Sequence, residues 1–231
     1  MAFKAGFKTR VLNGDFSLSA KATSVSLPLS IDMLDTTTLA DTAKRFVAGA
    51  ESSTFSVEGF IDVDTATDNA AWTASQPFTY GQEGLTIGDP VVMVTALRSS
   101  YELGSPVAGV SSFTLGGTTD GRTDFGRVLH DLTAVTTTEN GTAYDYGASS
   151  SAGAVAHLHV TAYSVATSAV FTVQDSADGS TGWATIGTFA TVTGVTSEAI
   201  TITGTVRRYL RYVATLTGAG SVTFAIAAAR R

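Results

Sequence analysis

Cysteine is absent from the 231-residue chain. Without thiols there is no disulfide framework, no thiolate nucleophile and no thiolate ligand for a metal. Charge is also scarce: 15% of the residues are charged, against about 25% in an average soluble domain. A surface this poor in charge is either solvated by hydroxyl groups, as in Thr- and Ser-rich β proteins, or becomes covered by another protein surface.

Positive charge and long apolar runs are lacking as well. The net charge of −6 and the sequence pI of about 4.9 argue against a surface that neutralises nucleic-acid phosphates. The first ten residues contain no apolar core, so we expect no secretory signal. The longest strongly apolar run, Val91–Leu97, is far shorter than the roughly 20 residues of a membrane helix. We therefore expect no membrane association.

No recognisable catalytic motif is present. No serine lies in a G-x-S-x-G context, and no glycine cluster has the spacing of a phosphate-binding loop. His157 and His159 could supply two metal ligands, but the simpler interpretation is two polar positions on the outer face of a strand. Asp175, Asp178 and Gly179 resemble part of a calcium loop, yet a hairpin turn explains them better. We expect neither an enzyme nor a required metal or cofactor.

The densest basic group is Arg207, Arg208 and Arg211. A strand would direct these side chains to both of its faces, so they do not predict a single anion site. Solvated strand edges or salt bridges between subunits are the simpler explanations.

Apolar and polar residues alternate with a period of two in short segments between turn-rich clusters, which is typical of an all-β chain. A short helix is predicted over Asp64–Gln76, with Pro77 ending it. The predicted strands cover residues 7–12, 16–20, 25–33, 54–63, 91–103, 107–115, 125–129, 157–162, 169–173, 185–192, 200–202, 206–216 and 222–228.

The composition shifts at residues 131–153, which are rich in Thr, Ser, Gly and Ala. This shift predicts a first domain over residues 1–135, a linker over residues 136–153 and a C-terminal β-sandwich over residues 154–231. The small sandwich would be Ig-like or jelly-roll-like. We expect the first domain to assemble without the second.

The strands predicted at residues 25–33 and 54–63 are joined by about twenty residues without a sustained period, far more than the two to five of a hairpin loop. We interpret this connection as a projecting arm that is poorly ordered in the isolated subunit. Its apolar residues would wait for another surface, and Lys44 with Arg45 would pair with acids of a neighbour or merely keep a loop tip soluble. The candidate interface residues are Asp35, Thr36, Leu39, Asp41, Lys44, Arg45, Phe46 and Val47.

Three segments of this region, Asp35–Thr37, Ala40–Gly49 and Phe55–Asp62, resemble the major tail tube protein of long-tailed (siphovirus-type) bacteriophages. The resemblance is sharpest over residues 35–62 and continues loosely to about residue 130. Residues 173–179 and 206–211 are similar to small sandwich domains appended to phage tail proteins. The resemblance implies a tail-tube-type β-sandwich or barrel followed by a decoration domain, in a structural protein of the virion.

The same resemblance implies six-membered rings that stack into a tube for DNA ejection, assembled in the host cytoplasm. The implied partners are further copies of the chain, a tape measure protein, a tail terminator and DNA that passes without specific binding. Closing a ring would remove exposed sheet edges, and an acidic lumen would repel DNA. The alternative is a carbohydrate-binding β-sandwich module that recognises a cell surface and stays small in solution.

Overall fold

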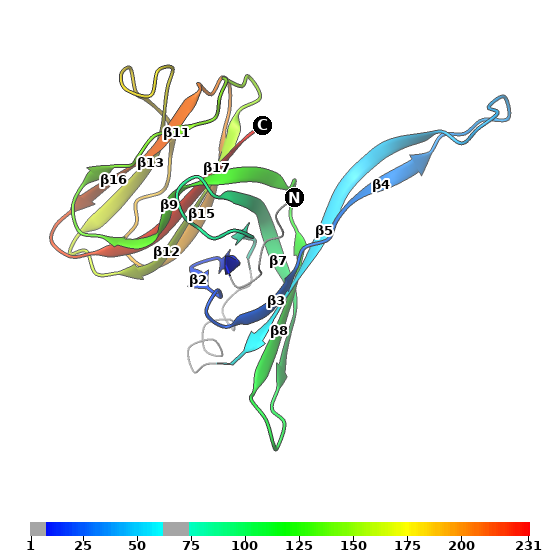
Figure 1. Ribbon diagram of the computed structural model, residues 1–231, viewed down its shortest axis with the longest axis horizontal. Helices are drawn as coiled ribbons and strands as arrows, with labels where there is room; N and C mark the ends of the chain where they lie inside the picture. Colours follow the sequence, from blue (N-terminus) through cyan, green and yellow to red (C-terminus); the bar gives the residue numbers. More distant parts are fainter. Residues whose placement is uncertain (1–7, 62–73) are drawn as a thin grey trace. The chain divides into compact units, whose positions relative to one another are not determined.

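The computed structural model describes residues 8–61 and 74–231, which form β-strands and no helix (Figure 1). The predicted all-β fold is therefore confirmed. The helix predicted over Asp64–Gln76 falls mainly on residues 64–73, which lie outside the described residues, and Gln76 begins a strand. The described part of the chain includes no helix with the length and apolar character that crossing a membrane would require.

Two compact units make up the described chain. Unit 1 comprises residues 8–20, 76–93 and 124–231, and unit 2 comprises residues 21–61, 74–75 and 94–123. The contacts thus divide the chain differently from the boundary predicted at residues 136–153. The reason is that unit 1 combines the beginning, the middle and the end of the sequence, whereas unit 2 is built from the two segments between them.

The larger sheet of unit 1 has the strand order β15-β12-β17-β9-β7-β6-β1-β2. Its strands are β1 (Arg10–Asn13), β2 (Phe16–Ser17), β6 (Gln76–Gly81), β7 (Pro90–Gly104, which continues into unit 2), β9 (Asp124–Val135), β12 (Ala154–Tyr163), β15 (Thr196–Ile202) and β17 (Val222–Arg230). The pairs β12–β15, β12–β17 and β9–β17 are antiparallel. Strands β2 and β6 also lie against β12, so the end of the sheet returns to its middle.

The second sheet of unit 1 packs on one face of the larger sheet. Its strands are β10 (Glu139–Asn140), β11 (Tyr144–Asp145), β13 (Ser168–Ser176), β14 (Ala184–Thr188) and β16 (Tyr209–Thr217). Leu158, Ile226 and Phe224 of the larger sheet meet Phe171 and Leu210 of the second in one buried core. This two-sheet arrangement is the β-sandwich that the spacing of the C-terminal strands predicted.

The other face of β12 and β17 is buried too. The side chains of Val155, Ala225 and Ala227 form a second apolar cluster with Leu12 and Met93. Successive residues of a strand point to opposite faces, so both central strands are covered on two sides. The small alanines of β17 leave room for the strands that cover this face.

The predicted linker is part of this sandwich, because β10 and β11 pair with β16. The Tyr146 hydroxyl donates to the Ala228 carbonyl at 2.7 Å. The last residue, Arg231, forms an ion pair with Asp124 at 2.8 Å. These contacts join residues 124–153 to the final strand.

Unit 2 is a sheet of β3 (Ala22–Ser26), β4 (Leu29–Asp35), β5 (Phe46–Phe60), β8 (Ser112–Thr119) and the later part of β7. Strand β5 pairs with β3, β4 and β8, and β8 pairs with β7. Phe55, Val57, Phe113 and Leu115 are buried on one face. Figure 1 shows the ribbon of β4 and β5 extending away from the other strands of unit 2.

We predict that a chain truncated after Val135, the end of the first domain expected from the sequence, does not fold as a stable protein. The truncation removes β12 and β17, which bury Val128 and Leu129 of β9. Far-ultraviolet circular dichroism and urea unfolding of the truncated chain will check this. A soluble truncated chain with a cooperative transition at the full-length midpoint would contradict it.

Candidate assembly surface

The connection interpreted as an irregular arm is a β-hairpin. Strands β4 and β5 pair antiparallel from Leu29 opposite Ser53 to Asp35 opposite Phe46. The loop between the strands is therefore confined to residues 36–45. The expectation that β5 begins at Thr54 was wrong by eight residues, because the first half of the strand pairs only with β4 and lacks the alternation of a half-buried strand.

The hairpin loop is held by its own hydrogen bonds. The Thr36 amide donates to the Arg45 carbonyl at 2.9 Å, and the Arg45 amide donates to the Thr37 hydroxyl at 2.9 Å. The Asp41 carboxylate accepts from the amide and the hydroxyl of Thr38 at 2.8 and 2.9 Å. Asp35 accepts from the Thr37 amide, and its hydrogen bonds to Thr37 lower the pKa of the Asp35 carboxyl. The loop thus has a defined shape.

Of the two cations of the loop, one already has a partner. Arg45 forms an ion pair with Asp41 at 2.9 Å. Lys44 is exposed and makes no hydrogen bond or ion pair with any residue that the structure describes. Lys44 is therefore the cation of this pair that could meet an acid of a neighbouring molecule, whereas Arg45 would have to share Asp41.

The hairpin carries large apolar side chains that are exposed to solvent. Leu39 at the tip is fully exposed, Met33 is 61% exposed and Phe46 is 49% exposed. All seven residues of β4 are exposed, and so are six of the first seven residues of β5. The exposed apolar residues of the hairpin are Leu29, Ile31, Met33, Leu34, Leu39, Phe46 and Val47.

Most of these side chains share one face of the ribbon. Cross-strand partners lie on the same face of a sheet. Met33 lies opposite Ala48, Asp35 lies opposite Phe46, and alternation adds Ile31. We call Leu29, Ile31, Met33 and Phe46 the apolar stripe. Along β5 this face continues through Ser53 to the buried Phe55 and Val57, so the stripe is an uncovered extension of the core face of unit 2.

Leu29, Ile31 and Met33 were expected from their alternation to form a half-buried strand. The alternation correctly indicated an apolar face, and the structure leaves that face open. The long segment between the two predicted strands could have indicated this exposure. A hairpin that projects away from the other strands has too few neighbours to bury its own side chains.

Two polar groups singled out in the sequence have other roles. His157 and His159 are buried and do not lie on an outer face of a strand. Asp178 accepts from the amides of Ser180 and Thr181 at 2.8 Å, and Gly179 adopts a φ of 76°, as the hairpin-turn interpretation requires. Within the described residues no group of three His, Asp or Glu side chains could hold a metal ion.

The three arginines are used within the chain. Arg207 pairs with the buried Asp175 at 2.6 Å, and Arg208 pairs with Asp145 at 2.5 Å. The hydrogen bonds from Arg208 are the main reason that the pKa of Asp145 falls to about 2. Arg211 donates to the Gln174 amide oxygen. The arginines therefore hold the second sheet of unit 1 together and form no common anion site.

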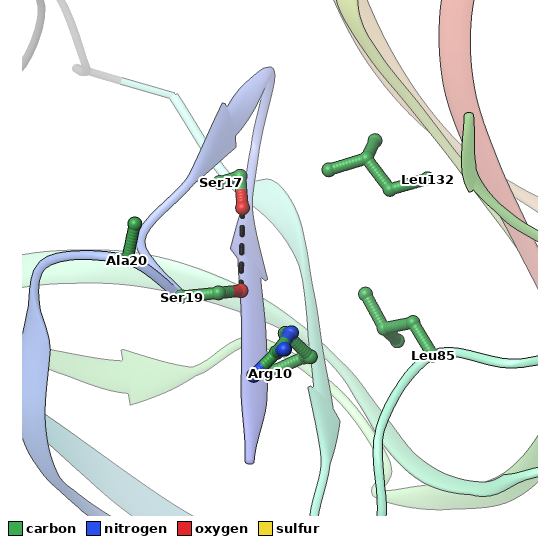
Figure 2. A pocket seen from close by; sticks show the side chains of 6 residues that line it. All are labelled: Arg10, Ser17, Ser19, Ala20, Leu85 and Leu132. Carbon is green, nitrogen blue, oxygen red and sulfur yellow. Dashed lines mark hydrogen bonds between the residues drawn. The ribbon is translucent and has the colours of Figure 1, made fainter. Parts of the chain in front are cut away.

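Unit 1 contains a recess of about 360 Å³ that is lined by two serine hydroxyl groups (Figure 2). Figure 2 shows Ser17 and Ser19 facing each other, with Arg10 beside them. The Ser17 hydroxyl donates to Ser19 at 3.2 Å, and Ser19 is also bonded to the backbone of Val11. These hydroxyls hold β1 to the turn after β2. The described residues that line the recess include no His, Asp or Glu.

No family model and no curated protein matches this sequence. Among solved structures, the chain is similar to a chain of the virion of a native gene transfer agent particle, with 16% identity over 53% of this chain and 98% of that chain and a TM-score of 0.45. The chain is also similar to a chain from the tail of an empty gene transfer agent particle with C6 symmetry. That match covers 53% of this chain and 98% of the other, with 14% identity and a TM-score of 0.46.

The chain is also similar to SPP1 Dit (gp 19.1), described as a hub of the adsorption apparatus in phages that infect Gram-positive bacteria. That match has 15% identity over 94% of this chain and 98% of that chain, with a TM-score of 0.38. At TM-scores of 0.46 or less, these likenesses assign neither a family nor a function to the chain.

We predict that Asp178→Ala lowers the melting temperature by the same amount in calcium as in a chelator. The carboxylate organises the turn after β13 through its own hydrogen bonds, so removing it loosens the turn whether or not calcium is present. Differential scanning calorimetry of both proteins in both buffers checks this. A wild-type melting temperature that rises with calcium while the variant's does not would restore the calcium-loop interpretation.

Proposed function

We propose that this chain is a structural, non-enzymatic subunit of a bacteriophage tail that assembles with copies of itself through the β4–β5 hairpin. The observation that carries the proposal is the apolar stripe, whose side chains have no cover within the described chain although they continue the core face of unit 2. The sequence resemblance over residues 35–62 supports the same function.

Physical considerations favour a second copy as the cover. An isolated two-stranded ribbon is marginally stable in water. Among the described residues no further strand pairs with β4 or with residues 46–53 of β5, and open strand edges pair readily with another chain. Fully burying a large apolar side chain contributes about 1.5–3 kcal/mol. A neighbouring copy that covers the apolar stripe would bury its side chains, and one that adds a strand to the ribbon would pair its open edges.

We propose that the hairpin of one copy binds a surface of the next copy other than its hairpin, which makes the contact head-to-tail and allows it to close into a ring. We propose six-membered rings that stack into the tail tube of a long-tailed phage, assembled in the host cytoplasm and carried in the virion. The tube would enclose a tape measure protein, end at a terminator and later conduct DNA. Lys44 would contribute an ion pair at the interface between subunits.

The face of unit 2 opposite its core suits a lumen. Thr114 of β8 lies opposite Glu58 of β5 and Glu102 of β7, and Ser56 lies beside Ser26. Glu58 and Glu102 are exposed and acidic, and the half-buried Thr114 between them carries a hydroxyl group. DNA phosphates would be repelled by such a surface and would pass without binding.

We predict that Met33→Ser with Phe46→Ser keeps the monomer folded and shifts assembly to a markedly higher protein concentration. Both side chains are about half exposed, so the monomer loses little, whereas the interface loses about 1 kcal/mol for each. Together this is about a 30-fold weaker association. Circular dichroism and analytical ultracentrifugation across a concentration series check the two halves of the prediction.

The matched control is Val195→Ser, which removes a side chain of similar exposure from unit 1 and should leave assembly unchanged. If the stripe variant still forms wild-type assemblies, the hairpin is not the interface. If the variant unfolds, the stripe belongs to the stability of the monomer itself.

We predict further that Glu58→Lys with Glu102→Lys gives tubes that retain DNA at low salt. Two lysines per subunit would replace side chains that repel DNA phosphates by side chains that attract them. The retention of DNA should weaken as the salt concentration rises. Co-sedimentation of short duplex DNA with assembled tubes measures this, with Glu58→Gln and Glu102→Gln as the neutral control. Equal retention by the lysine and glutamine variants would mean that this face does not line the channel.

The alternative function is a carbohydrate-binding module, favoured by two half-buried aromatic residues of unit 1. Arg211 lies 4.1 Å from the ring centre of Trp183, and Arg208 lies 5.0 Å from that of Tyr209. Aromatic rings beside fixed polar groups are common in ligand sites. We rank this function second because it gives no role to the hairpin. A protein that remains monomeric at all concentrations would favour it.

A further inference from the structure

Two histidines lie next to each other inside unit 1. His157 and His159 are two residues apart on β12, and their ring centres are 6.0 Å apart. Less than 2% of either residue is exposed. Nδ1 of His157 lies 3.1 Å from the Thr79 hydroxyl oxygen, and Nε2 of His159 lies 2.8 Å from the same oxygen. The other ring nitrogen of His159, Nδ1, lies 2.7 Å from the Gly14 carbonyl.

These contacts fix where each proton must be. The Gly14 carbonyl can only accept, so Nδ1 of His159 carries a hydrogen and, in the neutral ring, Nε2 accepts. The Thr79 hydroxyl must then donate its single hydrogen to His159. It is left to accept from His157, whose Nδ1 therefore carries a hydrogen too. The chain of hydrogen bonds is complete only while the His159 imidazole is neutral, whereas a proton on Nε2 of His157 would add a buried charge without breaking it.

This network joins distant parts of the sequence. Gly14 lies in the turn between β1 and β2, Thr79 lies on β6, and the histidines lie on β12. Strands β2 and β6 lie against β12 on this face. Thr79, His157 and His159 therefore form a polar contact between the early strands and the C-terminal half of unit 1.

The strands around the network bring no compensating charge. On β15 the partners of the two histidines are Ala199 and Ser197, and on β17 they are Ala227 and Ala225. Among the described residues the hydrogen bonds of both rings end at Thr79 and Gly14, with no carboxylate.

The ionisable residues of these strands face elsewhere or lie at the strand ends, and the β1–β2 turn carries one carboxylate, the half-buried Asp15. Glu198 of β15 lies opposite Leu158, on the other face of β12, and accepts from the Ala190 amide. Arg230 of β17 donates to the Tyr146 carbonyl. Arg10 is exposed at the start of β1, Tyr80 neighbours Thr79 on the opposite face of β6, and Asp15 follows Gly14 in the turn.

We propose that the His157–Thr79–His159 network is an acid-sensitive lock that holds the β1–β2 turn and β6 onto β12 at neutral pH and releases them in mildly acidic solution. A proton on Nε2 of His159 would point at the hydroxyl hydrogen of Thr79 and break the chain of hydrogen bonds. A proton on His157 would place a positive charge in an apolar interior beside the other imidazole. The lock belongs to unit 1, and the described part of unit 2 contains no histidine.

The direction of the pH effect follows from burial. Desolvation lowers the pKa of His159 to about 4 and the pKa of His157 well below its ordinary value. The unfolded chain binds these protons at an ordinary pKa of about 6.5. Stability is therefore complete above that pH and falls as the pH drops from about 6.5 to about 4. For His159 alone, the unfolding equilibrium shifts about 15-fold between pH 6.5 and pH 5.

Segment-resolved hydrogen exchange of the full chain at pH 6.5 and pH 5, corrected for intrinsic exchange rates, tests the lock. We expect protection in β1, β6 and β12 to fall at least 15-fold while protection in β5 and β8 changes much less. His157→Gln with His159→Gln should remove most of that difference, because glutamine keeps a donor and an acceptor and does not titrate, so that among the buried histidines of unit 1 only His130, whose pKa burial also lowers, still contributes. His130→Gln, at a third buried histidine outside the network, should retain it.

An equal loss of protection in both units of the wild-type protein, or an unchanged response in the double variant, would overturn the proposal. If the double variant does not fold, nuclear magnetic resonance of the wild-type imidazoles decides. Both rings should show a hydrogen on Nδ1 and stay neutral down to pH 5 in the folded protein. A ring that titrates near pH 6.5 without loss of structure would refute the lock.

Discussion

The hairpin surface depends on one property of β5, which is longer than the sheet that supports it. Residues 54–60 of β5 pair with β8, while residues 46–53 pair only with β4. A register shift in the β4–β5 pairing between Ile31 and Met33 keeps Phe46 on the same face as Phe55 and Val57, so this one face is buried at Phe55 and Val57 and exposed at Phe46. Apolar area left in water costs free energy in proportion to its size, and a two-stranded ribbon has no second layer with which to reduce it. Assembly with a neighbour removes that cost.

Local patterns in the sequence predicted much of the fold. The period of two located most strands, Asn13–Gly14 marked the first hairpin turn, where Gly14 has a φ of 60°, and the Asp–Gly pair at residues 178–179 marked another. The double-sided apolar run from Val91 correctly indicated a strand covered on both faces at its start. These successes share a cause, since alternation and turn chemistry are set by neighbouring residues.

What could not be predicted depends on contacts between residues far apart in the sequence. His157 alternates with apolar residues as a solvent-facing residue would, and only its pairing with Thr79, 78 positions earlier, makes its burial possible. The contact units differ from the division proposed at residues 136–153, because β9 pairs with the last strand of the chain. For the hairpin, alternation indicated an apolar face but not whether the chain itself covers it.

The central claim is that the hairpin's apolar stripe lacks cover in the monomer and gains it from another copy. Hydrogen exchange of residues 46–53, measured in dilute monomer and in the concentrated assembled protein, tests this most directly. We expect weak protection in the monomer, because these amides belong to an isolated ribbon, and strong protection after assembly. Equal protection in the two states, or strong protection already in the monomer, would contradict it.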